Sequence, residues 1–281
     1  MKKKMMFLLI GILMMSMMLA GCGAKETSKA DEPKETKVSE EKDDSLEEIK
    51  EKGEFVLGLD DSFPPMGFRD KKGEVVGFDI DLAKEVAKRM GVKLKIQPID
   101  WDGKVLSLNN KDIDVIWNGL TITEERKKQI GFSKVYIENR QVIVTGADSD
   151  IETKKDLAGK IVAVQLGSSG EDVLNADTET VSAVKEVVKF SNYTEALLDL
   201  KAGRVDAVVI DEIVGRYYMS KRPGEYEVAK EDFGKEGYGI GFRKDDTALI
   251  NEVDQILDEM KKDGTTAEIS KKWFGEDIVA K

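Results

Sequence analysis

The sequence IDVIWNGLTITEER, residues 113–126, contains a predicted strand, a turn and the start of a helix. Residues Ile113–Trp117 are mostly apolar and rich in β-branched side chains, which favours a buried strand. A helix is predicted to begin near Thr123, a residue type that often caps helices. Because open α/β sheets bind ligands outside the carboxyl ends of their strands, the turn between these elements is a candidate binding site.

Strand and helix patterns alternate along the rest of the chain. Apolar residues at helical spacing predict helices around residues 83–90 and 250–260, and Asn192 with Glu195 predicts a capped helix start. This alternation predicts an α/β fold with mainly parallel sheets and helices on both faces. The stretch from about Leu46 onward, about 235 residues, exceeds the usual size of one domain, so two lobes are expected. The predicted strands are Phe55–Leu59, Lys93–Gln97, Ile113–Trp117, Gln141–Val144, Ile161–Val164, Ala207–Ile210 and Gly239–Phe242.

Residues 1–21 have the pattern of a secretory signal peptide. Lysines at positions 2–4 precede an apolar run, Met5–Leu19, of about 15 residues. A membrane-spanning helix needs about 20. The run ends in small residues before Cys22, the only cysteine, and this junction resembles a bacterial lipoprotein box. We therefore expect cleavage before Cys22 and a lipid on its thiol, with a transmembrane anchor and an incidental cysteine as the alternative.

Residues 22–45 are predicted to form a flexible linker behind the lipid anchor. They carry many charges of both signs, one valine and no aromatic residue. Such a segment buries too little apolar area to offset the entropy of ordering it. An exposed helix is the alternative. Together with the signal peptide, this segment predicts a protein anchored to the outer face of the cell membrane.

The charge and composition argue against several classes of function. The formal net charge is −11, and it becomes −14 without residues 1–21, which contain three lysines and no acidic residue. Nucleic acid is therefore not expected as a partner, because both molecules are negatively charged. The chain has no histidine, which removes the commonest general acid–base group. No metal-ligand cluster or phosphate-binding loop is evident, so no metal or other cofactor is expected.

A free amino acid carries a carboxylate and an ammonium group on one carbon, and a dry site must pair both charges. Arg126 can bind a carboxylate through two N–H groups, and the turn Gly167–Gly170 offers backbone N–H groups at a helix start. Asp211, after an apolar strand, is the candidate partner of the ammonium group. Each residue also has an ordinary structural explanation: Arg126 as a solvated surface residue and Asp211 as a helix cap. Trp101 and Phe63 could equally be core aromatics.

Four segments in order resemble the family-3 solute-binding proteins of polar amino acid ABC importers. They are GFDIDLA at 77–83, GLTITEER at 119–126, Phe132-Ser133 before Tyr136, and KKWFG at 271–275. The resemblance runs from about Leu46 to the end of the sequence. It implies a bilobed periplasmic-binding fold of type II, in which two strands cross between the lobes. Lobe 1 would contain residues 46–137 plus 238–281, and lobe 2 would contain residues 141–234.

The same resemblance implies roles for individual residues. Arg126 would bind the ligand carboxylate with help from the backbone amides of Thr121 and Ser169. Asp211 would hold the ammonium group together with the Thr121 hydroxyl and the Gly119 carbonyl. The other implied site residues are Phe63 and Trp101 around the ligand side chain, Asp60 and Gln165 at its polar end, and Leu120 in the loop of Thr121.

The implied surroundings of the ligand side chain favour a hydrogen-bond donor or a positive charge. Asp60 would lie near two aromatic rings, a combination that attracts cations. We expect arginine or lysine, with glutamine or another polar amino acid as the alternative. Glutamine-binding members of the family carry a lysine at the position of Gln165, which weighs against glutamine. The expected partners are an ABC permease and its ATPase, and the protein is expected to act as a monomer by hinge closure and not as an enzyme.

Two other classes of function remain open from the sequence. Some relatives of this fold are dehydratases of small acids, for which Asp60, Asp61 or Asp211 could serve as the acid–base group. Others are ligand-sensing modules joined to a membrane receptor, and no hydrophobic span follows the last predicted helix.

Overall fold

The computed structural model describes residues 43–280. The predicted signal peptide, Cys22 and nearly all of the predicted linker lie outside these residues. Within them, no helix is both long enough and apolar enough to cross a membrane.

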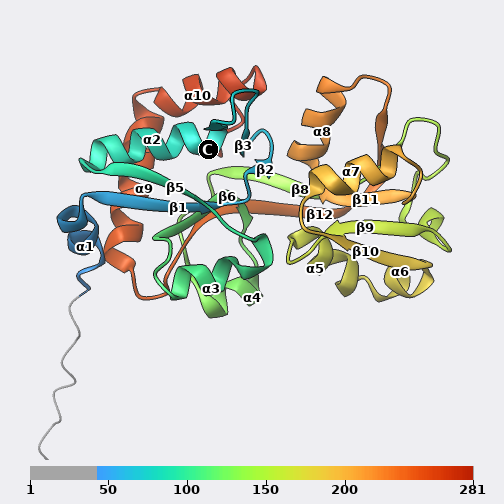
Figure 1. Ribbon diagram of the computed structural model, residues 1–281, viewed down its shortest axis with the longest axis horizontal. Helices are drawn as coiled ribbons and strands as arrows, with labels where there is room; N and C mark the ends of the chain where they lie inside the picture. Colours follow the sequence, from blue (N-terminus) through green and yellow to red (C-terminus); the bar gives the residue numbers. More distant parts are fainter. Residues whose placement is uncertain (1–42, 281) are drawn as a thin grey trace, which may run out of the picture. The chain divides into compact units, whose positions relative to one another are not determined.

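A mixed sheet runs through the described chain (Figure 1). Its strands follow the order β10-β9-β11-β8-β12-β6-β1-β5, and the short β7 pairs with β12. The bounds are β1 (Glu54–Leu59), β5 (Lys93–Pro98), β6 (Val115–Thr121), β7 (Gly131–Phe132), β8 (Ile137–Gly146), β9 (Ile161–Gln165), β10 (Glu186–Phe190), β11 (Ala207–Asp211) and β12 (Tyr226–Phe242). A small second sheet contains β2 (Ser62–Phe63), β3 (Gly67–Arg69) and β4 (Val75–Val76). Every predicted strand overlaps an observed one, whereas β10 and the short strands β2, β3, β4 and β7 were not predicted.

Two long antiparallel strands, β8 and β12, connect two lobes (Figure 1). In the first lobe β1 lies parallel to β5 and β6, and β6 pairs with the end of β12. In the second lobe β9 lies parallel to β10 and β11, and β11 pairs with β8. The chain therefore crosses between the lobes on adjacent strands. The predicted α/β fold, bilobed and of type II, is confirmed.

Helices cover both faces of the sheet (Figure 1). In the first lobe α2 contacts β5 and α3 contacts β1, and in the second lobe α5 and α7 contact β9. Asn192 caps α7, because its side chain accepts a hydrogen bond of 2.9 Å from the backbone N–H of Glu195. The bounds are α1 (Ser45–Lys52), α2 (Phe78–Met90), η1 (Trp101–Gly103), α3 (Lys104–Asn109), α4 (Glu124–Gln129), η2 (Lys154–Leu157), α5 (Ser169–Ala176), α6 (Thr178–Ala183), α7 (Tyr193–Lys201), α8 (Glu212–Lys221), α9 (Thr247–Lys262) and α10 (Thr265–Phe274).

Successive side chains of a strand point to opposite faces of the sheet. In the central strands, the side chains on both faces are buried. In β1, Phe55 and Leu57 enter the largest hydrophobic cluster, whereas Val56 enters a separate cluster on the other face. In β11, Val208 and Val209 divide in the same way. Strands buried on both faces have few places for polar side chains except their ends. The polar groups of this fold therefore gather at the carboxyl ends of the strands and on the crossing strands.

Candidate functional site

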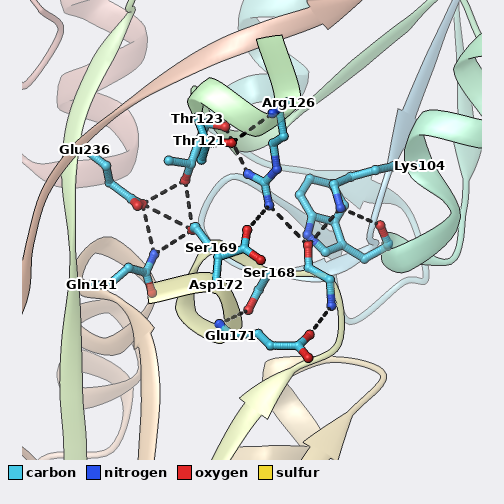
Figure 2. Close-up of polar contacts among 12 residues, drawn as sticks. Lys104, Thr121, Thr123, Arg126, Gln141, Ser168, Ser169, Glu171, Asp172 and Glu236 are labelled. Atoms are coloured by element: carbon cyan, nitrogen blue, oxygen red, sulfur yellow. Dashed lines mark hydrogen bonds and ion pairs between the residues drawn. The ribbon is translucent and has the colours of Figure 1, made fainter. Parts of the chain in front are cut away.

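Arg126 lies on α4, the helix that follows β6, and points into the protein. The Thr123 hydroxyl caps α4 by accepting a hydrogen bond of 3.1 Å from the Arg126 backbone N–H. The guanidinium donates to the Thr121 carbonyl at 2.9 Å and, across the lobes, to the Gly167 carbonyl at 3.1 Å (Figure 2). Only 6% of the Arg126 surface is exposed, so the explanation of a solvated surface arginine is wrong. Burial lowers the pKa of Arg126, but arginine keeps its charge in proteins.

Lys104 is a second cation beside Arg126, and the sequence analysis did not identify it. Its ammonium donates to the Trp101 carbonyl at 3.0 Å and, across the lobes, to the Gly167 carbonyl at 2.8 Å. It also lies 4.8 Å from the centre of the Trp101 ring. Burial, helped by the charge of Arg126, lowers the pKa of Lys104 to about 7. A lysine at the start of a short helix gives no signal in the sequence that distinguishes it from a solvated one.

The start of α5 brings two serines to the junction of the lobes. Ser168 caps this helix, since its hydroxyl accepts a hydrogen bond of 3.0 Å from the backbone N–H of Glu171. The next residue, Ser169, places its hydroxyl 2.9 Å from that of Thr121 in the other lobe (Figure 2). The predicted residues Thr121, Arg126 and Ser169 therefore meet in one polar network.

Asp211 forms the opposite, acidic side of the same network. Asp211 directly precedes α8, but its side chain makes no capping hydrogen bond to this helix, so the explanation of Asp211 as a helix cap is wrong. The carboxyl group accepts hydrogen bonds from Asn139 at 2.8 Å, Gln141 at 2.8 Å and the Tyr238 hydroxyl at 2.6 Å. Burial, followed by the neighbouring charge of Glu236, raises the pKa of Asp211 to about 8.

Glu236 reaches into the network from the crossing strand β12, and the sequence analysis missed it. One of its oxygens accepts hydrogen bonds from the Thr121 hydroxyl at 2.8 Å, from Asn139 at 2.6 Å and from Gln141 at 2.9 Å. Gln141 also donates to the Ser169 hydroxyl at 3.0 Å (Figure 2). Donors from β6 and from the crossing strand β8 thus converge on this carboxyl group.

Asp60 and Gln165 form a second contact between the lobes. The Gln165 amide donates to the Asp60 carboxyl group at 2.8 Å and to the Ser191 carbonyl at 3.0 Å. Burial raises the pKa of Asp60 to about 6. The Phe63 ring lies nearby in the sequence and packs 6.1 Å from the Tyr193 ring, centre to centre. Asp60 and Gln165, both predicted to contact the polar end of the ligand side chain, therefore lie together and form a hydrogen bond with each other.

Gly119 and Leu120 lie on β6 directly before Thr121. Gly119 has φ 59°, and a Cβ there would lie 2.9 Å from the Phe63 ring, so a side chain is excluded both by strain and by space. The Gly119 N–H donates a hydrogen bond of 2.8 Å to the buried carboxyl group of Asp79. The Leu120 side chain enters a hydrophobic cluster together with Trp101, so it does not reach the polar network.

The arrangement provides two separated charges of opposite sign at the junction of two lobes. Cations from the first lobe face the start of α5. The carboxyl group of Glu236 accepts a hydrogen bond from the Thr121 hydroxyl, and Asp211 shares the donor Asn139 with it. Within residues 43–280, no group of three or more His, Cys, Asp or Glu residues could hold a metal ion. A basic side and an acidic side in one site match the two charges of a zwitterion.

Comparison with known proteins gives a consistent picture. A model of the bacterial extracellular solute-binding proteins, family 3, matches residues 55–276. The L-cystine-binding protein TcyJ of Escherichia coli is 35% identical over 235 residues, which is 83% of this chain and 87% of TcyJ. The lysine/arginine/ornithine-binding periplasmic protein of E. coli is 36% identical over 227 residues, 78% of this chain and 86% of that protein. A histidine-bound substrate-binding protein of an ABC uptake transporter from Streptococcus pneumoniae superimposes with a TM-score of 0.82 at 39% identity, covering 85% of this chain and 99% of that one.

Proposed function

The chain belongs to the bacterial extracellular solute-binding proteins, family 3, and we propose that it binds a free polar amino acid between its lobes for an ABC importer. The observation that carries this proposal is the polar network between the lobes. Through Thr121 and Ser169 it links the cation of Arg126 with the carboxyl group of Asp211. Relatives that bind cystine, glutamine, arginine and histidine support a polar amino acid as the ligand class.

The two charges of an amino acid match the two sides of the network. Arg126 has five N–H donors. Its two hydrogen bonds to backbone carbonyls leave donors for the ligand carboxylate. The backbone N–H of Ser169, at the first turn of α5, is a further donor for that group. Asp211, with the Thr121 hydroxyl and the Gly119 carbonyl, accepts hydrogen bonds from the ammonium group.

Hinge motion of β8 and β12 explains how the ligand enters. Direct hydrogen bonds join the lobes at Thr121–Ser169, Lys104–Gly167 and Asp60–Gln165. A ligand enters only when these contacts separate, and it favours closure only through contacts that the open form lacks. Arg126 and the aromatic residues of the first lobe bind the ligand first, and Ser169 and Asp211 complete the site on closure.

The ligand side chain is proposed to lie near Asp60 and Gln165. Phe63 and Trp101 supply apolar surface there, and a carboxylate beside aromatic rings favours a cationic side chain. We therefore propose arginine or lysine as the ligand, with glutamine as the alternative. Gln165 already binds Asp60 at 2.8 Å, so a ligand that donates hydrogen bonds must compete with that contact.

The remaining proposals concern the protein's place in the cell. We propose that Cys22 carries a lipid after removal of residues 1–21 and that residues 22–45 form the linker. The protein is proposed to work as a monomer on the outer face of the cell membrane. We also propose the bounds of the two lobes: residues 46–137 plus 238–281 form lobe 1, and residues 141–234 form lobe 2. Mass spectrometry of the mature protein checks the lipid directly: an unmodified Cys22 would reject it.

A thermal-shift screen of the purified protein against the twenty amino acids tests the function. A ligand at about 100 times its dissociation constant adds about 2.7 kcal/mol to the free energy of unfolding. For a chain of this size, that corresponds to a rise in melting temperature of about 5–10 °C. We expect the largest rise with arginine or lysine and none with acidic amino acids. No rise with any of the twenty would reject the proposed function.

A further inference from the structure

Two carboxyl groups occupy the acidic side of the network, although an amino acid brings only one ammonium group. Asp211 ends β11 in the second lobe, and Glu236 comes from the crossing strand β12. The amide of Asn139 donates to both, at 2.8 Å and 2.6 Å, and so does the amide of Gln141, at 2.8 Å and 2.9 Å. The shared donors hold the two carboxyl groups side by side.

Because one Asn139 nitrogen lies 2.8 Å from the Asp211 carboxyl oxygen and 2.6 Å from the Glu236 carboxyl oxygen, these two oxygens are at most about 5.4 Å apart. Two ionised carboxylates this close in a buried site repel each other, and one shared proton removes the repulsion. Gln141 is fully buried, and its side-chain oxygen has no hydrogen-bond partner. The surroundings of Asp211 and Glu236 therefore offer a further acceptor but little access to water. The arrangement therefore suits a cationic donor, either a proton or a group that replaces it.

We propose that Glu236 is a ligand-binding residue, and that Asp211 and Glu236 share one proton that the ammonium group of the ligand displaces. This inference rests on the proposed function and names a residue beyond those that the sequence analysis assigned to the site. The three N–H donors of an ammonium group match Asp211, Glu236 and one further acceptor, the Thr121 hydroxyl or the Gly119 carbonyl. The displaced proton leaves to the solvent, so the charge of the site stays balanced.

Charged and titratable groups face this pair from several elements. Arg126 comes from α4, Tyr193 from α7 and Tyr238 from β12 itself, and each interacts electrostatically with both carboxyl groups. Arg126 favours ionisation, whereas burial opposes it and raises the pKa of Asp211 to about 8. The free site favours a proton on the acidic side, whereas the cation of the ligand favours ionised carboxylates. Binding therefore releases a proton, and the affinity falls as the pH decreases through the raised pKa of Asp211.

Two other groups in the site also titrate near neutral pH. The pKa of Lys104 is about 7, and a bound carboxylate would make Lys104 take up a proton, the opposite sign. The pKa of Asp60 is about 6, so it also contributes at lower pH. The decisive quantity is therefore the difference in proton release between the wild-type protein and a variant that lacks the Glu236 charge.

Isothermal titration calorimetry at pH 7, in buffers with different ionisation enthalpies, counts the protons released per ligand. The probe is the amino acid that raises the melting temperature most in the screen of twenty. We expect the wild-type protein to release more protons per ligand than Glu236→Gln, because Asp211 in the variant no longer faces a second carboxylate, although it stays buried. The matched control is Glu138→Gln, which changes an exposed glutamate on β8 beside Gly237 of β12, and it should release as many protons as the wild type.

Each outcome decides the proposal. Equal proton release by Glu236→Gln and the wild type overturns it while leaving the proposed function intact. Should Glu236→Gln fail to fold, the variant Lys104→Met, which removes the opposing titration, must itself release close to one proton, and a count near zero overturns the proposal. A wild-type protein that binds none of the twenty amino acids overturns the function and this inference together.

Discussion

The basic and the acidic side of the interlobe network differ in the groups that hold them in place. The basic side, Lys104 and Arg126, is held by hydrogen bonds to the backbone carbonyls of Trp101, Thr121 and Gly167. The only carboxylate paired with it in the described chain is that of the exposed Asp172, 3.7 Å from Arg126. The acidic side, Asp211 and Glu236, is held by the side chains of Asn139, Gln141, Tyr238 and Thr121. Backbone carbonyls are fixed by the fold and cannot titrate, whereas the acidic side can gain or lose a proton.

The two sides also differ in how they respond to hinge motion. Arg126 and Lys104 both belong to the first lobe, and each makes one hydrogen bond to Gly167 of the second lobe. Asn139, Gln141 and Glu236 lie on the crossing strands themselves, where the chain passes between the lobes. The basic side should therefore bind the ligand before the lobes close, and the acidic side should complete its contacts with the ligand only on closure. The predictions below test this division.

Arg126→Ala should have the largest effect, because no other group in the described site offers a permanent, bidentate partner to a carboxylate. Loss of one partner of a buried charge pair costs about 2–5 kcal/mol, so the affinity should fall by at least about thirtyfold. Calorimetric titration with the ligand from the screen measures the change.

Two neighbouring variants serve as controls for Arg126→Ala. Lys127→Ala removes a cation from the exposed side of the same helix, where Lys127 pairs only with Glu124 among the contacts of the described chain, and its affinity should not change. Arg126→Lys keeps the charge without the planar pair of donors, so its affinity should lie between those of the wild type and Arg126→Ala. Unchanged affinity in Arg126→Ala would show that the basic side does not bind the carboxylate.

Asp211→Asn should have a smaller effect on affinity but a clear effect on closure. The amide keeps the shape of the side chain and removes a charge, while Glu236 remains to bind the ammonium group. We expect a loss of about 1–2 kcal/mol in binding, or about five- to thirtyfold. Small-angle X-ray scattering should show a smaller ligand-induced decrease in the radius of gyration than in the wild type. A full decrease at unchanged affinity would contradict the role assigned to the acidic side.

The difference between the two sides also explains what the sequence could predict. Arg126 follows a clear strand and a Thr123 cap, so local patterns fixed its position on α4, and the resemblance to the family supplied its role. Asp211 likewise ends an apolar strand, β11, whose continuous apolar run is easy to recognise. Both positions depend on short-range signals, and the fold class followed from the same alternation of strands and helices. The roles of these residues in binding remain predictions.

Glu236 could not be found in this way, because β12 carries no regular pattern. The strand spans 17 residues, and its pairing with β8 shifts register between Val228 and Asp232 and again before Lys235. Each shift breaks the rule that alternate residues share a face, so the sequence cannot tell which side of the strand Glu236 occupies. The part of the strand that was predicted, Gly239–Phe242, belongs to its fully buried end.

Lys104→Met should have the smallest effect on affinity, because Arg126 retains the contact with Gly167 and can bind the carboxylate alone. The change in affinity should stay within about fivefold. Its effect on stability depends on pH. The pKa of Lys104 is about 7 in the folded protein and near 10.5 in the unfolded chain, so the unfolded chain binds more protons between these values. The free energy of unfolding of the wild type should therefore rise from pH 7 to pH 9 more than that of Lys104→Met. Urea denaturation of both proteins at the two pH values measures this difference, and parallel changes in the two proteins would mean that Lys104 remains charged in the fold, with the basic side carrying two permanent cations.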